Sequence, residues 1–202
     1  MILRARFKNL SQRLRADANK GSAAIEFAMV APIFFMILMA TIETGLVFFA
    51  HSALQNALND AARLVRTGQT ACFSLDSNNK CKAMTEAEFR EQVCKEASAL
   101  LKNCGTDGNG DSDLQFDVNA YPSGFTGVTN SSPLDANQDL PKLSVFNVGN
   151  ACDVVLVRAF YKWPLFTPGL STLLGNMHGS YHLLTTAAAF RNEPYTTTTG
   201  GC

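Results

Sequence analysis

Histidine is scarce in this chain, and no cysteine precedes Cys72. The three histidines are His51, His178 and His182, of which only the last two have the spacing of two metal ligands on a helix, and Gly179 lies between them. The sequence has neither a glycine-rich phosphate loop nor a nucleophile elbow. These absences argue against the common hydrolases and nucleotide-binding enzymes. We therefore expect no enzymatic activity, no cofactor and no metal.

An acidic turn is the one weak candidate for a metal site. Asp107, Asn109, Asp111 and Asp113 alternate along the chain as do the first ligands of a calcium loop. The sixth position of that loop is Ser112 where glycine is required, and the twelfth is a valine where glutamate is required. We interpret the segment as a solvated turn.

Charge is missing from one long stretch near the N-terminus. No charged residue lies between Phe27 and Ile42, and after Glu43 the apolar run continues to Ala50. As a helix this run is about 36 Å long, which is enough to cross a bilayer. The pattern predicts a transmembrane helix over residues 22–50. Glu43 is about 28 Å along it, close to the far interface, where we expect its carboxylate to be solvated.

The charge balance gives the expected orientation. Residues 1–21 hold six basic residues and one acidic residue, a net charge of +5, so the rest of this neutral chain carries −5. Basic residues flank transmembrane helices on the cytoplasmic side. We therefore expect residues 1–21 to lie in the cytoplasm and the domain after residue 50 to lie outside. An acidic outer domain also argues against a nucleic-acid partner.

Six cysteines follow the apolar run, and an even number on one side of a membrane predicts disulfides in an oxidising compartment. A local bridge between the first two is possible, as is a bridge from either of them to the third, and the fourth and fifth could meet across a sheet. A bridge to the last would fix the C-terminal tail. Only a bridge between Cys94 and Cys104 is excluded, because ten residues of helix would separate them by about 15 Å. The candidates are Cys72, Cys81, Cys94, Cys104, Cys152 and Cys202.

Helical periodicity continues beyond the membrane segment. An apolar stripe runs to Val65, which predicts that the helix extends to about Arg66 and stops near Gly68. A second helix is predicted over residues 86–102, where Thr85 and Glu88 have capping-box spacing. The members of the first stripe are Leu46, Phe49, Ala53, Leu54, Ala57, Leu58, Ala61, Leu64 and Val65.

β-Branched and aromatic residues then predict an antiparallel sheet. The expected strands are Leu114–Tyr121, Lys142–Val148, Asp153–Trp163 and Tyr181–Arg191, with residues 122–140 as a loop and Leu165–Asn176 left open. The predicted fold is α+β: a long N-terminal transmembrane helix that extends into an outer domain with a small antiparallel sheet. The expected domain covers residues 51–195, followed by a tail over residues 196–202.

The segment from Lys20 to Phe27, KGSAAIEF, resembles the processing site of type IV-type prepilins. It is most similar to the site of TadE-like minor pseudopilins of the tight-adherence (Flp) pilus system, as are the run AIEFAMVAPIFFMILMATIETG and the segment AAAFRNEPY. The resemblance implies a basic leader that a prepilin peptidase removes between Gly21 and Ser22. Glu26 would then be the fifth residue of the mature chain and Phe27 the aromatic residue after it.

The resemblance also implies a function and partners. The protein would be a minor pseudopilin, a structural and assembly component of a Flp-type pilus with a pilin-like outer domain. Its partners would be the prepilin peptidase, other pilins and pseudopilins, the inner-membrane assembly platform and membrane lipid, and methylation would be a further modification. It would cross the bacterial inner membrane once. A carboxylate at Glu26 could pair with the new amino group at Ser22 during assembly. The alternative is a membrane-tethered adhesin or a binding module at the pilus tip.

Overall fold

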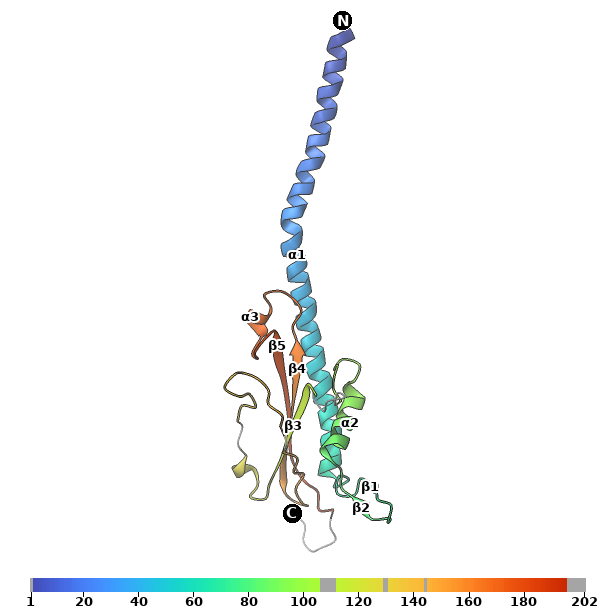
Figure 1. The fold of residues 1–202 in the computed structure, drawn as a ribbon, viewed down its shortest axis with the longest axis vertical. Helices are drawn as coiled ribbons and strands as arrows, with labels where there is room; N and C mark the ends of the chain where they lie inside the picture. The colour runs from blue at the N-terminus through green and yellow to red at the C-terminus, as the bar shows by residue number, and fades with distance from the viewer. Residues whose placement is uncertain (1, 106–111, 129–130, 144, 196–202) are drawn as a thin grey trace. The chain divides into compact units, whose positions relative to one another are not determined.

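The computed structural model describes residues 2–105, 112–128, 131–143 and 145–195, and side chains from Gly21 onward. The chain divides into two compact units, Met1–Glu43 and Thr44–Cys202. Helix α1, Ile2–Arg66, contributes residues to both of them (Figure 1).

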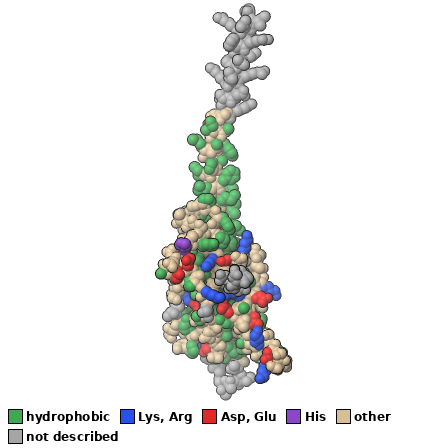
Figure 2. Space-filling view, viewed as in Figure 1, with side chains coloured by type: hydrophobic (Ala, Val, Ile, Leu, Met, Phe, Trp, Pro, Cys, Tyr) green, Lys and Arg blue, Asp and Glu red, His purple; other side chains and the backbone are tan. Residues whose placement is uncertain are grey.

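The N-terminal unit consists of α1 alone. Between Gly21 and Glu43 most of its side chains are apolar and exposed, and hydrophobic side chains surround this part of the helix in Figure 2. In the described part of the chain, α1 is the one helix that is long and apolar enough to cross a membrane. Pro32 lies within it, a residue that membrane helices tolerate.

In the C-terminal unit, α1 buries one stripe of small and apolar side chains against the domain. Most of the predicted stripe from Leu54 to Val65 is buried, and Ala53 and Leu64 are partly buried, but the prediction is wrong at Leu46 and Phe49, which are exposed. The helix ends as predicted, because Gly68 adopts a φ of 73° and its N–H bonds to the carbonyl of Val65. The buried residues are Val47, Ala50, Leu54, Ala57, Leu58, Ala61, Ala62 and Val65.

Helix α2, Glu86–Ala97, starts with the predicted capping box. The Thr85 side chain accepts from the Glu88 N–H, and the Glu88 carboxylate accepts from the Thr85 N–H. The hydrogen bonds that the Glu88 carboxylate accepts, first from the Thr85 backbone N–H and second from the Thr85 hydroxyl, lower the pKa of Glu88. The predicted end of this helix at residue 102 is wrong. The chain leaves the helix after Ala97 and turns back through Asn103, which has a left-handed φ of 51°.

The sheet is antiparallel with the strand order β3-β4-β5. Strands β3 (Leu114–Tyr121) and β5 (Tyr181–Arg191) have the predicted bounds, and β4 is Val154–Pro164. A separate hairpin pairs β1 (Ser74–Leu75) with β2 (Cys81–Lys82). The α+β fold with a long N-terminal helix and small antiparallel sheets is thus confirmed.

The segments between strands differ in part from the prediction. The predicted strand Lys142–Val148 is not found, because the described residues of this segment pair with the backbone of β3 only at the bridge between Phe146 and Val118. The loop over residues 122–140 contains the short 3-10 helix η1, Phe125–Gly127. Leu165–Asn176, for which the sequence predicts no element, contains the short helix α3, Ser171–Leu174.

The sheet has two differently covered faces. On one face Phe116 of β3 packs edge-on against Phe89 of α2, with ring centroids 5.2 Å apart. On the other face Arg158 of β4 forms a buried ion pair with Asp117 of β3 and donates to the carbonyl of Ser131 at 2.8 Å. The long loop before β4 therefore packs on the face opposite α2. An apolar cluster of Leu140, Phe160, Met177 and Leu183 completes this layer.

Candidate processing and assembly site

The four residues predicted to take part in processing and assembly lie close together on α1. Gly21, Ser22, Glu26 and Phe27 are all exposed, and Phe27 retains 69% of its accessible surface. The Ser22 hydroxyl donates to the Glu26 carboxylate at 3.1 Å. Residues four apart lie on the same face of a helix. A new amino group at Ser22 would therefore start one helical turn from the carboxylate of Glu26.

The fold itself does not require glycine at position 21. A Cβ atom built there meets no atom within 4 Å, and the backbone is not in the left-handed region. Glycine in a helix interior is less stable than alanine by about 1 kcal/mol. Gly21 is thus unfavourable for the isolated helix, and a reason for its presence must lie outside the fold of this chain.

The helix that follows offers a long apolar surface and no catalytic group. Such a surface can be covered by lipid or by the apolar helices of other subunits. Between Gly21 and Glu43 the exposed large apolar residues are Ile25, Phe27, Met29, Val30, Ile33, Phe34, Phe35, Met36, Ile37, Leu38, Met39 and Ile42.

Glu43 is not solvated, which corrects the expectation from sequence. Only 6% of its surface is exposed. The reason is helical spacing, since Glu43, Val47, Ala50 and Leu54 follow one another at intervals of three or four residues and are all buried. The face of α1 that is buried includes this carboxylate.

Two disulfides join described residues of the C-terminal unit. Cys72 and Cys81 form the local bridge, with Cα atoms 4.8 Å apart. Cys94 and Cys104 form the second, with Cα atoms 5.5 Å apart, so the exclusion of this pair is wrong. It is wrong because α2 ends at Ala97 and the chain then reverses beside the helix. Because Cys104 pairs with Cys94, the possible bridge from Cys104 to Cys152 is not formed. Cys152 is not a free thiol. Cys202 lies outside the described residues.

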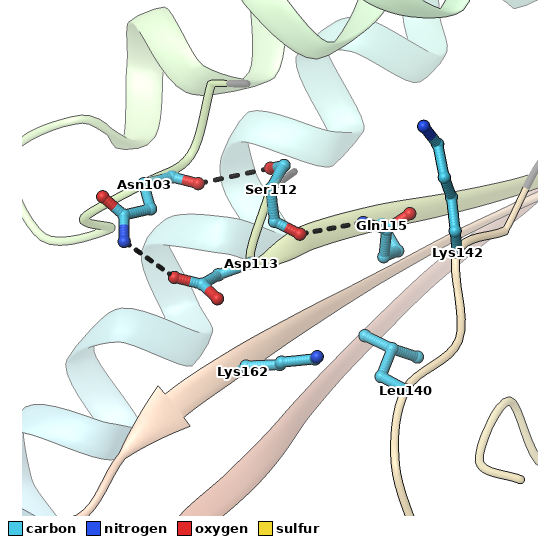
Figure 3. Close-up of a pocket in the computed structure, with 7 residues that line it drawn as sticks. All are labelled: Asn103, Ser112, Asp113, Gln115, Leu140, Lys142 and Lys162. Atoms are coloured by element: carbon cyan, nitrogen blue, oxygen red, sulfur yellow. Dashed lines mark hydrogen bonds between the residues drawn. The ribbon is translucent and has the colours of Figure 1, made fainter. Parts of the chain in front are cut away.

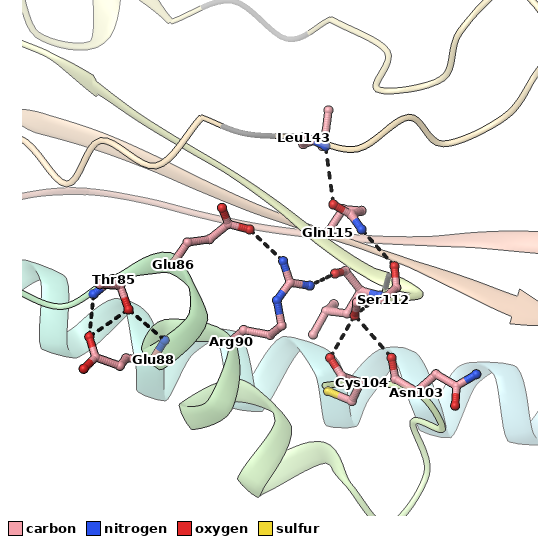
Figure 4. Close-up of polar contacts among 10 residues, drawn as sticks. Thr85, Glu86, Glu88, Arg90, Asn103, Cys104, Ser112, Gln115 and Leu143 are labelled. Atoms are coloured by element: carbon pink, nitrogen blue, oxygen red, sulfur yellow. Dashed lines mark hydrogen bonds and ion pairs between the residues drawn. The ribbon is translucent and has the colours of Figure 1, made fainter. Parts of the chain in front are cut away.

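A network of polar contacts holds the reversed segment (Figure 4). The Ser112 hydroxyl donates to the carbonyl of Cys104 at 3.0 Å and also contacts that of Asn103. On the β4 side the Tyr161 hydroxyl donates to the carbonyl of Lys102 at 2.6 Å. Burial raises the pKa of Tyr161 to about 12. The turn after α2 is thus bound to the helix by the disulfide and to the sheet side by hydrogen bonds to its backbone carbonyls.

Arg90 joins α2 to β3 from a buried position. Its guanidinium contacts the Glu86 carboxylate at 2.6 Å and donates to the carbonyl of Leu114, a residue without exposed surface (Figure 4). Replacing it with methionine leaves that carbonyl without its donor. We expect Arg90→Met to lower the free energy of unfolding by about 1–3 kcal/mol, measured by thermal unfolding in detergent. Lys82→Met is the matched control, because it removes only an exposed ion pair with Glu88. Equal effects of the two substitutions would contradict this role of Arg90.

The residues of the weaker metal candidates do not form a site. Asp107, Asn109 and Asp111 lie outside the described residues, and the Asp113 carboxylate accepts from the Asn103 side chain at 3.1 Å. His182 contacts the carbonyl of Leu174 at 2.6 Å through Nδ1. Within residues 2–105, 112–128, 131–143 and 145–195 no group of three potential metal ligands is found.

A polar cavity of about 250 Å³ lies beside the start of β3 (Figure 3). Its side chains carry one carboxylate, two ammonium groups, two amides and the Ser112 hydroxyl, which contacts the carbonyls of Asn103 and Cys104. This cavity offers no recognisable chemistry for catalysis. It is lined by Asn103, Ser112, Asp113, Gln115, Leu140, Lys142 and Lys162.

Comparison with known proteins identifies the N-terminal segment. The family model described as TadE-like protein matches residues 21–63, which begin at the candidate processing site and continue along α1. No curated protein and no solved structure matches the chain. Membership in this family implies a pilin-like protein associated with the Tad pilus. Over residues 21–63, which form part of helix α1, the chain is thus similar to the TadE-like protein family.

Proposed function

We propose that this protein is a minor pseudopilin, a structural and assembly component of a Flp-type pilus. A prepilin peptidase removes the leader between Gly21 and Ser22, and the mature chain is anchored in the bacterial inner membrane by α1. The outer unit then lies in the periplasm. The match of residues 21–63 to the TadE-like family carries this proposal.

Three features of the structure support it. The site at Gly21 is exposed on a helix, where a peptidase can reach the backbone. The apolar surface that follows is suited to lipid and to neighbouring pilin helices. The outer unit contains disulfides, which persist in oxidising compartments such as the periplasm.

The mass of the mature N-terminus tests the proposal. In cells that contain a Tad system, we expect a chain that begins at Ser22, identified by mass spectrometry of the protein from the membrane fraction. The same gene expressed without a prepilin peptidase should give a chain that keeps Met1. A cut after Ala50, or an intact leader in the presence of the peptidase, would refute the proposal.

Glu26 is expected to act through its charge. Glu26→Ala should leave the protein in the membrane but reduce pilus formation and co-purification of other pilins several-fold, because the amino group at Ser22 loses its partner. Glu26→Gln separates charge from hydrogen bonding, since the amide oxygen can still accept from the Ser22 hydroxyl. We expect both variants to fail alike. Normal piliation in either variant would count against pairing between the two charges.

A further inference from the structure

The connection between β4 and β5 is free of charge and presents large apolar side chains. No aspartate, glutamate, lysine or arginine lies between Lys162 and Arg191. Phe166 and Leu173 expose 75% and 81% of their surfaces, more than any other large apolar residue described in the C-terminal unit. Exposed apolar side chains without nearby charge mark a contact surface.

These side chains point outward from an ordered loop. Leu165, Leu170 and Met177 are buried and anchor the loop in the domain. The Leu165 N–H donates to the carbonyl of Ser180 at 2.8 Å, which closes the base of the loop. Its short helix α3 is held by a backbone bond from Leu174 to Leu170, also 2.8 Å long. The exposure of Phe166 and Leu173 is therefore set by the backbone conformation of the loop.

Contacts along α1 show at which end of the unit the loop lies. The Gln55 side chain donates to the carbonyl of Ala187 at 3.5 Å, and Arg66 pairs with Glu193 at 3.2 Å, so α1 and β5 run in the same direction. From Ala187 back to Tyr181 the strand covers about 20 Å, the length of about 13 helical residues. The loop before Tyr181 thus lies at the end of the C-terminal unit where the part of α1 that belongs to this unit begins.

The same end carries other apolar surface and lies away from the charged hairpin. The helical segment of this unit begins at Thr44 and exposes Phe48 and Phe49, at 69% and 61%. Within this unit, Figure 1 shows α3 near that end and the β1–β2 hairpin near the opposite end. Tyr181, 42% exposed, stands at the base of the loop, and tyrosine is common where protein meets the lipid headgroups.

We propose that the loop over residues 165–180 inserts Phe166 and Leu173 into the interfacial region of the bilayer, as a second membrane contact beside α1. The occupant of this surface is lipid, because the loop lies at the end of its unit where the helical segment begins, and residues 163–190 contain no charged side chain with which to select a polar partner. The contact would fix the orientation of the outer unit relative to the membrane. This inference rests on the proposed anchoring by α1.

Tryptophan fluorescence in vesicles tests the contact. The single tryptophan, Trp163, is replaced with phenylalanine, and Phe166→Trp is introduced into the full chain. Phe125→Trp is the matched control, because Phe125 is also exposed, at 58%, but follows β3 beyond Tyr121, at the opposite end of the sheet. Both chains are reconstituted into phosphatidylcholine and phosphatidylglycerol vesicles that contain lipids brominated on the acyl chains.

We expect several-fold stronger quenching by brominated lipid at position 166 than at position 125, and the reverse order with aqueous iodide. Equal quenching at the two positions, or full access of iodide to position 166, would overturn the inference. If the Trp163 substitution impairs folding, Trp163 is retained in both variants. The quenching measured for the parent chain is then subtracted from that of each variant before the two positions are compared. A chain that does not enter the vesicles at all would instead contradict anchoring by α1, so the two failures are distinguishable.

Discussion

Gly21→Ala will leave the leader attached while the chain still folds. The structure separates these two outcomes, because a Cβ at position 21 meets no atom within 4 Å and alanine is the better helix former by about 1 kcal/mol. Any effect on cleavage must then arise in the complex with the peptidase, which has to approach the backbone at this point. We expect cleaved product to fall by at least about tenfold, which corresponds to about 1.4 kcal/mol in the barrier.

Gly45→Ala is the matched control for this substitution. Gly45 also lies in α1, is exposed and has no atom within 4 Å of an added Cβ. Both variants raise helix propensity equally, so a general effect of helix stability on processing would appear in both. Pulse-labelling followed by gel separation of the uncut and cut chains measures the rate. Normal cleavage of Gly21→Ala, or equal losses in both variants, would show that Gly21 is not a recognition residue.

The parts of this protein that local patterns specify were predictable from sequence. The capping box at Thr85 is built from two residues three positions apart, and the stop of α1 depends on Gly68 alone. Apolar and polar residues alternate along β3, and β5 carries β-branched and aromatic residues. The bounds of both strands agree with the prediction. In these elements the chemistry that sets the structure lies within a few residues along the chain.

The end of α2 was not predictable in this way. Leu100 and Leu101 continue the helical spacing of apolar residues, which favours a longer helix. In the structure Leu101 lies in a turn and its side chain is buried there. Asn103 then reverses the chain in a left-handed conformation. Asparagine tolerates this conformation better than most residues, so Asn103 was an available signal for the turn. The closing bonds come from Ser112 and Tyr161, which are distant in sequence.

Phe146 illustrates a second limit. Apolar residues around it favour a strand, but among the described residues the backbone of this segment pairs with that of β3 only at one bridge, where the Val118 N–H donates to the carbonyl of Val145 at 3.0 Å. Its ring instead packs against Phe89 of α2, with centroids 5.5 Å apart. Burial of an aromatic side chain between a helix and a sheet edge gives the same sequence pattern as a strand. Only the position of α2 distinguishes the two.

Removal of the Cys94–Cys104 disulfide will destabilise the C-terminal unit more than removal of Cys72–Cys81. The two bridges close loops of similar length, with sequence separations of 10 and 9, so each restricts the unfolded chain to a similar extent. That restriction accounts for about 2–4 kcal/mol in each case. They differ in the folded state, because Cys104 is 5% exposed and Cys72 and Cys81 are exposed. Cys94 is partly buried, so replacing this bridge with two alanines also leaves unfilled space between α2 and the turn.

The comparison between Cys94→Ala/Cys104→Ala and Cys72→Ala/Cys81→Ala therefore isolates the packing contribution. We expect the first double variant to be the less stable by about 1–2 kcal/mol, measured as the difference in unfolding free energy of the full chain in detergent. It should also be cut faster by protease between Ser98 and Gly105, since the turn then depends on Ser112 and Tyr161 alone. Equal stability of the two variants would mean that Cys94–Cys104 acts only on the unfolded chain. An unchanged cleavage pattern would show that the polar contacts suffice to hold the reversed segment against α2.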